Sequence, residues 1–115
     1  MKSLSILIPV FNEEESLQAL FDELKRDFEN NQSIEVIFIN DGSSDGSQKL
    51  IEKEIANHST WKLINLYRNY GKSVALQSGI DIASGELIAT LDADLQDDPK
   101  ELINLVSELK NDDVI

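Results

Sequence analysis

The chain has 115 residues, of which 41% are hydrophobic, so it is long enough for one domain with a single core. Its formal net charge of −12 disfavours nucleic acid and anionic lipid as partners, and the absence of cysteine excludes disulfides and thiolate metal sites. No apolar stretch approaches the roughly 20 residues that span a bilayer, and the first apolar run is too short for a signal peptide, which favours a cytoplasmic location without membrane contact.

Four short apolar runs rich in β-branched residues predict buried strands at 4–10, 34–40, 61–67 and 86–91. Apolar side chains at helical spacing predict a helix after each strand. The side chains that mark these four helices are Leu17, Leu20, Phe21, Leu24 and Phe28, then Leu50, Ile51 and Ile55, then Val74, Ala75, Ser78 and Ile82, and finally Leu102, Val106 and Leu109. This alternation predicts an α/β fold in which a parallel sheet has helices on both faces.

The last residues, "NDDVI", predict a turn followed by the start of a fifth strand. A natural domain seldom stops on entry into its own sheet. We therefore expect residues 1–115 to be the N-terminal part of a longer domain.

Two helix starts carry capping signals. Asn12 is expected to cap the first helix, with Glu15 three residues later completing a capping box. Asp98 is expected to cap the fourth helix, followed by Pro99 at the first helical position. This interpretation gives Asp98 a structural role, and Asp97, which precedes the cap, is expected to be solvated.

Residues just past each strand mark the edge where an open α/β sheet binds ligands. In the order of the strands along the chain, they are Phe11, Asn12 and Glu13, then Asp41 and Gly42, then Arg68, Asn69, Gly71 and Lys72, and then Asp92, Ala93, Asp94 and Gln96. All four strand ends carry polar or charged residues. We expect them to converge on one edge of the sheet, called the rim below.

The segment "DAD" at 92–94 predicts a divalent-metal site. Residues two apart in an extended chain point the same way, so Asp92 and Asp94 can face one point, and Ala93 is small enough to admit a ligand. Gln96 offers a further oxygen. Such donors suit Mg²⁺ or Mn²⁺, which keep open positions for phosphate oxygens and would relieve the repulsion between the carboxylates. The alternative is a polar loop whose acids face water.

The segment "NDGSSDGS", residues 40–47, predicts a strand-to-helix turn. Its glycine spacing is neither a dinucleotide fingerprint nor a phosphate loop. Ser44 or Asp45 can cap the second helix. Asp41, placed before the turn, could accept a hydrogen bond from a base N–H.

The segment "RNYGKS", residues 68–73, adds two cations to an otherwise acidic rim. Arg68 or Lys72 could contact phosphate or base. The alternative is that both form salt bridges with nearby acids. Gly71 would allow a ligand to approach the backbone closely.

Taken together, these motifs resemble glycosyltransferase family 2, which has the GT-A fold. The matching segments are "IPVFNEEES", "NDGSSDGS", "RNYGKSVALQSGI", "ASGE" and "LDADLQDDP", and they occur in the family's order over nearly the whole chain. "DADLQDDP" together with "RNYGK" is most similar to the branch that glycosylates polyprenyl phosphates such as dolichyl and undecaprenyl phosphate. The resemblance implies a strand order of 3-2-1-4.

The resemblance also implies a role for each site residue. The nucleotide pocket would be lined by Pro9, Phe11, Glu13 and Ala93. Asp41 would bind the base, and Arg68 or Lys72 would lie near the nucleotide. Mg²⁺ or Mn²⁺ would be held on the diphosphate by Asp92, Asp94 and Gln96, with Asp94 as the catalytic residue. The family often has an acid where this chain has Asn40.

The implied reaction is inverting transfer of a sugar from a nucleotide-sugar, a UDP-sugar ahead of a GDP-sugar, to a lipid-phosphate or saccharide acceptor. A polyprenyl phosphate is already an anion, whereas a sugar hydroxyl would need a carboxylate base, expected beyond residue 115. The longer protein would act at the cytoplasmic face of the membrane in cell-envelope polysaccharide synthesis, and the isolated chain would be inactive. The alternative is a non-catalytic module of the same fold that binds nucleotide or metal.

Overall fold

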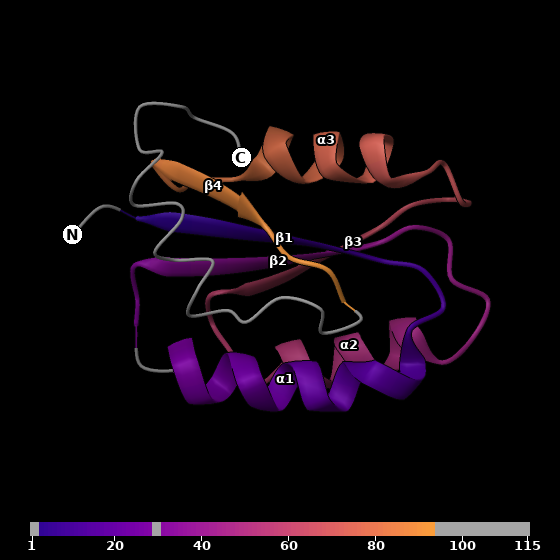
Figure 1. The fold of residues 1–115 in the computed structure, drawn as a ribbon, viewed down its shortest axis with the longest axis horizontal. Helices are drawn as coiled ribbons and strands as arrows, with labels where there is room; N and C mark the ends of the chain where they lie inside the picture. Colours follow the sequence, from indigo (N-terminus) through magenta and orange to yellow (C-terminus); the bar gives the residue numbers. More distant parts are fainter. Residues whose placement is uncertain (1–2, 29–30, 94–115) are drawn as a thin grey trace.

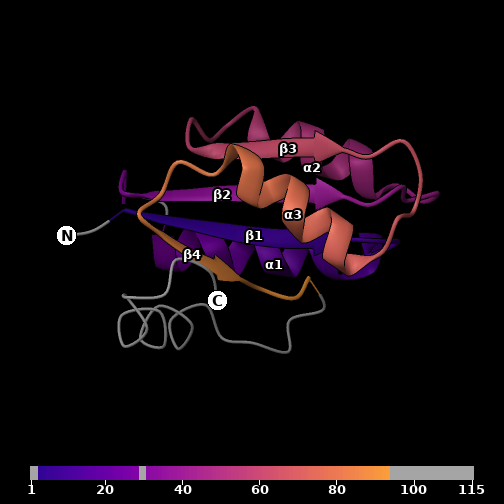
Figure 2. The ribbon, with the colours of Figure 1, turned by 90° about the horizontal axis from the view of Figure 1, so that it is seen from above.

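The computed structural model describes residues 3–28 and 31–93. Its elements in chain order are β1 (Leu4–Val10), α1 (Glu14–Phe28), β2 (Ile34–Asn40), α2 (Ser47–Ile55), β3 (Trp61–Asn65), α3 (Lys72–Ile82) and β4 (Leu87–Thr90). The strands form one parallel sheet in the order β3-β2-β1-β4, which is visible in Figure 2. The predicted α/β fold and strand order are confirmed. The expected fourth helix, its Asp98 cap and the fifth strand lie outside the described residues.

Helices cover both faces of the sheet, with α1 and α2 on one face and α3 on the other (Figure 1). Alternate residues of the central strands therefore enter two separate core layers. Beneath α1 and α2, Phe38 packs edge-on against Phe21, with ring centroids 5.6 Å apart. Beneath α3, Leu7 and Ile39 belong to the second layer and contact Gly79 of the helix closely. Among the described residues, no helix combines the length and apolarity needed to cross a bilayer.

Strand β3 ends at Asn65, two residues before the predicted end at 67. The reason is that its partner β2 ends at Asn40, which pairs with Asn65. The Leu66 N–H still donates to the Asn40 carbonyl oxygen at 2.9 Å, but the chain then leaves the sheet and Tyr67 is 93% exposed. An apolar pattern continues past the point where strand pairing stops.

The predicted capping box at the start of the first helix is wrong. Asn12 has a φ of 52°, and helix α1 begins two residues later. The Asn12 side-chain oxygen instead accepts hydrogen bonds from the N–H groups of Ser44 and Asp45, at 2.8 and 3.3 Å. The Asn12 N–H donates to the Ser43 hydroxyl at 3.0 Å, so it does not pair with Glu15.

The starts of α1 and α2 cap each other. The Asp45 carboxylate accepts the Ser47 N–H of α2 at 2.9 Å and the Glu14 N–H of α1 at 3.2 Å, while Glu14 accepts the Gly46 N–H at 3.1 Å. Burial raises the pKa of Asp45, but the hydrogen bonds from Ser47 and Glu14 outweigh it and hold this pKa below its usual range. The loops after β1 and β2 are thereby fastened together at the rim.

At the opposite end of the sheet, Glu35 of β2 connects all four strands. Its carboxylate accepts hydrogen bonds from the Ser5 hydroxyl of β1 at 2.7 Å, from Lys62 of β3, and from the N–H and hydroxyl of Ser84 before β4 at 3.0 and 3.1 Å. Burial raises the pKa of Glu35, but these hydrogen bonds outweigh it, so the pKa lies below its usual value of 4.5.

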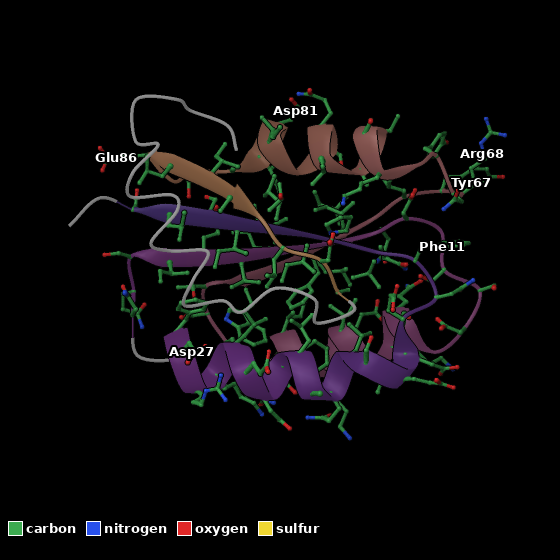
Figure 3. All side chains as sticks on the ribbon, viewed as in Figure 1. Phe11, Asp27, Tyr67, Arg68, Asp81 and Glu86 are labelled. Atoms are coloured by element: carbon green, nitrogen blue, oxygen red, sulfur yellow. The ribbon has the colours of Figure 1, made fainter. Side chains whose placement is uncertain are left out.

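Replacing Glu35 with glutamine is expected to lower the free energy of unfolding by about 1–2 kcal/mol at pH 7, because hydrogen bonds to a charged acceptor are lost. Since the pKa in the folded chain is below that of the unfolded chain, this stabilisation is complete above a pH of about 4.5 and is lost as pH falls through the folded pKa. Urea unfolding between pH 7 and pH 3 should therefore show a steeper loss of stability in the unchanged chain than in the variant. Glu86→Gln, at an exposed side chain at the same end (Figure 3), is the control, and an equal effect of both substitutions would contradict this role of Glu35.

Candidate functional site

A pocket of about 320 Å³ lies at the rim, where the strands end. Residues at or just after the ends of all four strands line it, and they are Pro9, Val10, Phe11, Glu13, Asp41, Asn69, Gly71, Lys72, Asp92 and Ala93. Among the described residues to which the resemblance gave a role in the site, all line this pocket except Arg68. The parallel sheet explains the convergence, because the carboxyl ends of its strands meet at one edge.

The wall formed by β1 and β4 is held by a hydroxyl. Leu91 continues the pairing of β4 beyond its last residue, since its N–H donates to the Leu7 carbonyl oxygen at 3.0 Å. The Ser16 hydroxyl lies 3.1 Å from the carbonyl oxygen of Ala93 and 3.2 Å from the carboxylate of Glu13. These contacts keep residues 91–93 beside β1 and place Asp92 at the pocket.

Asp41 holds the loop between β3 and α3. Its carboxylate accepts hydrogen bonds from the Tyr70 N–H at 2.8 Å, the Gly71 N–H at 3.0 Å and the Asn69 side-chain amide at 3.1 Å. Gly42, at a φ of 73°, lets the preceding turn lie directly against the backbone of this loop. The loop that carries Lys72 is thereby positioned over the end of β2.

The two cations of the "RNYGKS" segment lie in different places. Lys72, the first residue of α3, forms a salt bridge in the pocket wall between its ammonium nitrogen and Asp92 Oδ1, at 3.0 Å. The Arg68 guanidinium instead lies over the Tyr70 ring, 5.1 Å from the ring centroid. Figure 3 shows Arg68 and Tyr67 at the periphery of the rim. Lys72 is therefore the cation of this pair that lines the pocket.

The predicted metal site is only partly described. Asp94 and Gln96 lie outside the described residues, and within those residues no group of three or more acidic, histidine or cysteine side chains is arranged to hold a metal. Asp92 offers a partly exposed carboxylate at the pocket wall, which is the type of ligand that Mg²⁺ and Mn²⁺ take. Its present partner is the Lys72 ammonium, so a bound cation would replace one positive charge with another.

Asn69 is the lining residue whose contribution the sequence did not reveal. The segment that contains it was recognised, but its contact with Asp41 spans 28 residues and no local pattern encodes it. The structure also explains Asn40. Its amide donates to Asn65 at 3.0 Å and its oxygen accepts the Ser43 N–H at 3.1 Å, so this buried residue does not line the pocket. A carboxylate at this position could not make the first of these bonds.

A parallel α/β sheet with a polar pocket at its carboxyl-terminal edge is typical of nucleotide-binding proteins. The family model for "Glycosyl transferase family 2" matches residues 5–115. The chain therefore belongs to glycosyl transferase family 2.

The names of two curated relatives describe enzymes that act on polyprenyl phosphates. An undecaprenyl-phosphate 4-deoxy-4-formamido-L-arabinose transferase of Aeromonas hydrophila is 45% identical over 109 residues, which cover 92% of this chain and 33% of the relative. A dodecaprenyl-phosphate galacturonate synthase of Rhizobium johnstonii is 38% identical, with 93% of this chain and 32% of the relative covered. The chain thus spans about a third of the length of these relatives.

Two solved structures show the same fold at low sequence identity. Residues 1–349 of TarS from S. aureus match with a TM-score of 0.78 and 22% identity, covering 95% of this chain and 32% of that one. The mannosyltransferase PcManGT from Pyrobaculum calidifontis, in complex with GDP-Man and Mn²⁺, matches with a TM-score of 0.75 and 22% identity, covering 81% of this chain and 28% of that one. These matches establish the GT-A architecture of the sheet.

Proposed function

We propose that residues 1–115 form the nucleotide-sugar-binding, N-terminal part of an inverting glycosyltransferase whose acceptor is a polyprenyl phosphate. The observation that carries this proposal is the pocket at the rim, which all four strand ends line with groups suited to a nucleoside diphosphate. The names of the relatives, one an undecaprenyl-phosphate and the other a dodecaprenyl-phosphate enzyme, support the acceptor class. The donor is a UDP-sugar in preference to a GDP-sugar.

In this proposal the pocket residues divide between the two ends of the donor. Asp41 binds the base, in a pocket whose walls include Pro9, Phe11, Glu13 and Ala93. Lys72 lies at the diphosphate end, beside Asp92. Arg68 lies over the Tyr70 ring and does not line the pocket, so it has no direct part in binding in this proposal.

Asp92, Asp94 and Gln96 would hold Mg²⁺ or Mn²⁺, with Asp94 as the catalytic ligand. When bound, the cation supplies charge stabilisation to the departing nucleoside diphosphate. PcManGT, which shares the fold, has been solved with Mn²⁺ and GDP-Man. The Lys72 ammonium, released from Asp92, would be free to pair with a phosphate oxygen of the donor.

A polyprenyl phosphate acceptor fits a site without a strong general base, because its attacking oxygen is already an anion at neutral pH. The bond from this oxygen to the anomeric carbon forms as the bond to the diphosphate breaks, which inverts the configuration. The groups that bind the acceptor are expected in the remainder of the longer protein. We infer that the longer protein works at the cytoplasmic face of the membrane.

Calorimetric titration of the chain with UDP and with GDP, each with and without Mn²⁺, tests the donor site. Nucleotide binding is expected to require Mn²⁺ and to be lost in Asp94→Ala, because the diphosphate would then face uncompensated acids. Asp81→Ala, which removes an exposed carboxylate of α3 far from the pocket lining, is the matched control and should bind normally. Metal-independent binding would leave only a nucleotide-binding module, and absence of binding would contradict the donor site.

A further inference from the structure

Most of the hydrogen-bonding capacity of Asp41 is already used within the chain. Its Oδ2 accepts from the Asn69 amide nitrogen at 3.1 Å and from the Gly71 N–H at 3.0 Å, and its Oδ1 accepts from the Tyr70 N–H at 2.8 Å. An ionised carboxylate has about four acceptor positions, two on each oxygen. Oδ2 is therefore saturated, and Oδ1 keeps one position for a ligand.

The group that helps to saturate Oδ2 lines the same pocket. Asn69 is held against Asp41 by two contacts, because its amide nitrogen also donates to the Asp41 carbonyl oxygen at 3.2 Å. These two contacts engage both hydrogens of the Asn69 amide, so a ligand that reaches Oδ1 finds one free acceptor position and no free donor from Asn69. The complementary ligand edge has one N–H donor with no second donor beside it.

Uracil and thymine present such an edge, because their N3–H lies between two carbonyl groups. Guanine presents two adjacent donors, N1–H and the N2 amino group. Oδ1 can accept one of them, and the other would lie against the saturated Oδ2 and the amide of Asn69. Asp41 is only 4% exposed, so water has little access to replace the missing acceptor. An unpaired buried donor lowers affinity by a factor of about ten or more.

We propose that Asn69 is a specificity-determining residue, which makes the pocket select uridine or thymidine diphosphates over guanosine diphosphates by occupying Oδ2 of Asp41. The selection rests on the proposed function, because it requires the base to dock against Asp41. It adds to that function a mechanism of base choice. Removing the Asn69 amide returns an acceptor position to Oδ2, which makes the carboxylate able to receive both donors of guanine.

Titrations of the chain with UDP, dTDP and GDP, each with Mn²⁺, test the selection. UDP and dTDP are expected to bind at least about tenfold more tightly than GDP. In Asn69→Ala the ratio of UDP to GDP affinity is expected to fall by about tenfold, because the second donor of guanine gains an acceptor at Oδ2. Asn57→Ala, which changes an exposed asparagine in the turn after α2, should leave the ratio unchanged.

The possible failures are distinguishable. GDP that binds the unchanged chain as tightly as UDP would overturn the selection and leave the donor site standing. An unchanged ratio in an Asn69→Ala chain with native circular dichroism would overturn the role of Asn69. Failure of all three nucleotides to bind would overturn the proposed function and the selection with it. The first comparison uses the unchanged chain and does not depend on the folding of a variant.

Discussion

Replacing Gly42 with alanine is expected to lower the free energy of unfolding by about 4 kcal/mol. Gly42 has a φ of 73°, and a side chain in this left-handed region costs about 1–2 kcal/mol. A Cβ atom there would also lie 2.3 Å from the Arg68 carbonyl carbon and 2.4 Å from the Asn69 nitrogen. These are backbone atoms, so the loop between β3 and α3 has to move, at a cost similar to that of overpacking a core, about 1–3 kcal/mol.

Gly71→Ala is the matched control for Gly42→Ala. Gly71 also has a positive φ, 102°, but a Cβ atom there would have no other atom within 4 Å. It should therefore carry only the conformational cost, about 1–3 kcal/mol. Urea unfolding of both variants separates the two contributions. Equal destabilisation would contradict the close packing of Gly42 against the loop. We also expect Gly42→Ala to weaken UDP binding, because the displaced loop carries Asn69 and Lys72.

The central strands could be predicted from sequence because they are buried on both faces. Apolar residues fill β1 and β2 almost without interruption, so the ends of the apolar runs coincide with the ends of these strands. The end of β3 could not be predicted in this way. It depends on where β2 stops, and the local pattern at Leu66 and Tyr67 carries no information about the length of a neighbouring strand.

The error at Asn12 has the same physical origin. An asparagine before a helix is a favourable N-cap, and the sequence around it supports that interpretation. The side chain instead serves a turn 32 residues later, while Asp45 and Ser47 of that turn supply acceptors to the start of α1. Two loops that meet at the rim exchange their capping groups, and propensity rules treat each loop alone. Such exchange is expected where consecutive strands of a parallel sheet end side by side.

The sequence predicted which residues line the site better than it predicted the contacts between them. Topology alone predicts that the residues after each strand lie at one edge, and some residues from each of the four strand ends line the pocket. The sequence left open a salt bridge from Lys72 to a nearby acid, but it did not identify Asp92 as the partner. The Asn69 and Asp41 hydrogen bond was likewise beyond prediction, because each contact depends on the conformation of a loop. Topology therefore determines which residues meet at the rim, and loop geometry determines which of their atoms are left for a ligand.

Asp41→Ala is expected to lower the free energy of unfolding by about 3 kcal/mol, measured by urea unfolding without any ligand. The substitution removes the acceptor for the amide of Asn69 and for the N–H groups of Tyr70 and Gly71, and each of these part-buried hydrogen bonds to a charged acceptor contributes about 1.5–3 kcal/mol. Partial hydration of the loop keeps the total below the sum. Hydrogen exchange of the Tyr70 and Gly71 amides should accelerate in the same variant, because both lose their acceptor.

Two comparisons separate this role of Asp41 from a general effect of removing charge. Asp81→Ala removes an exposed carboxylate of α3 that accepts from Gln77, and its effect should stay within about 0.5 kcal/mol. Asp41→Asn keeps one acceptor oxygen but directs an amide donor at the other donors of the loop, so its loss should fall between those of the two alanine variants. If Asp41→Ala were as stable as Asp81→Ala, the carboxylate would not hold the loop. A large loss together with fast exchange at Tyr70 and Gly71 alone would show that the Asp41 carboxylate holds the loop that forms this wall of the pocket.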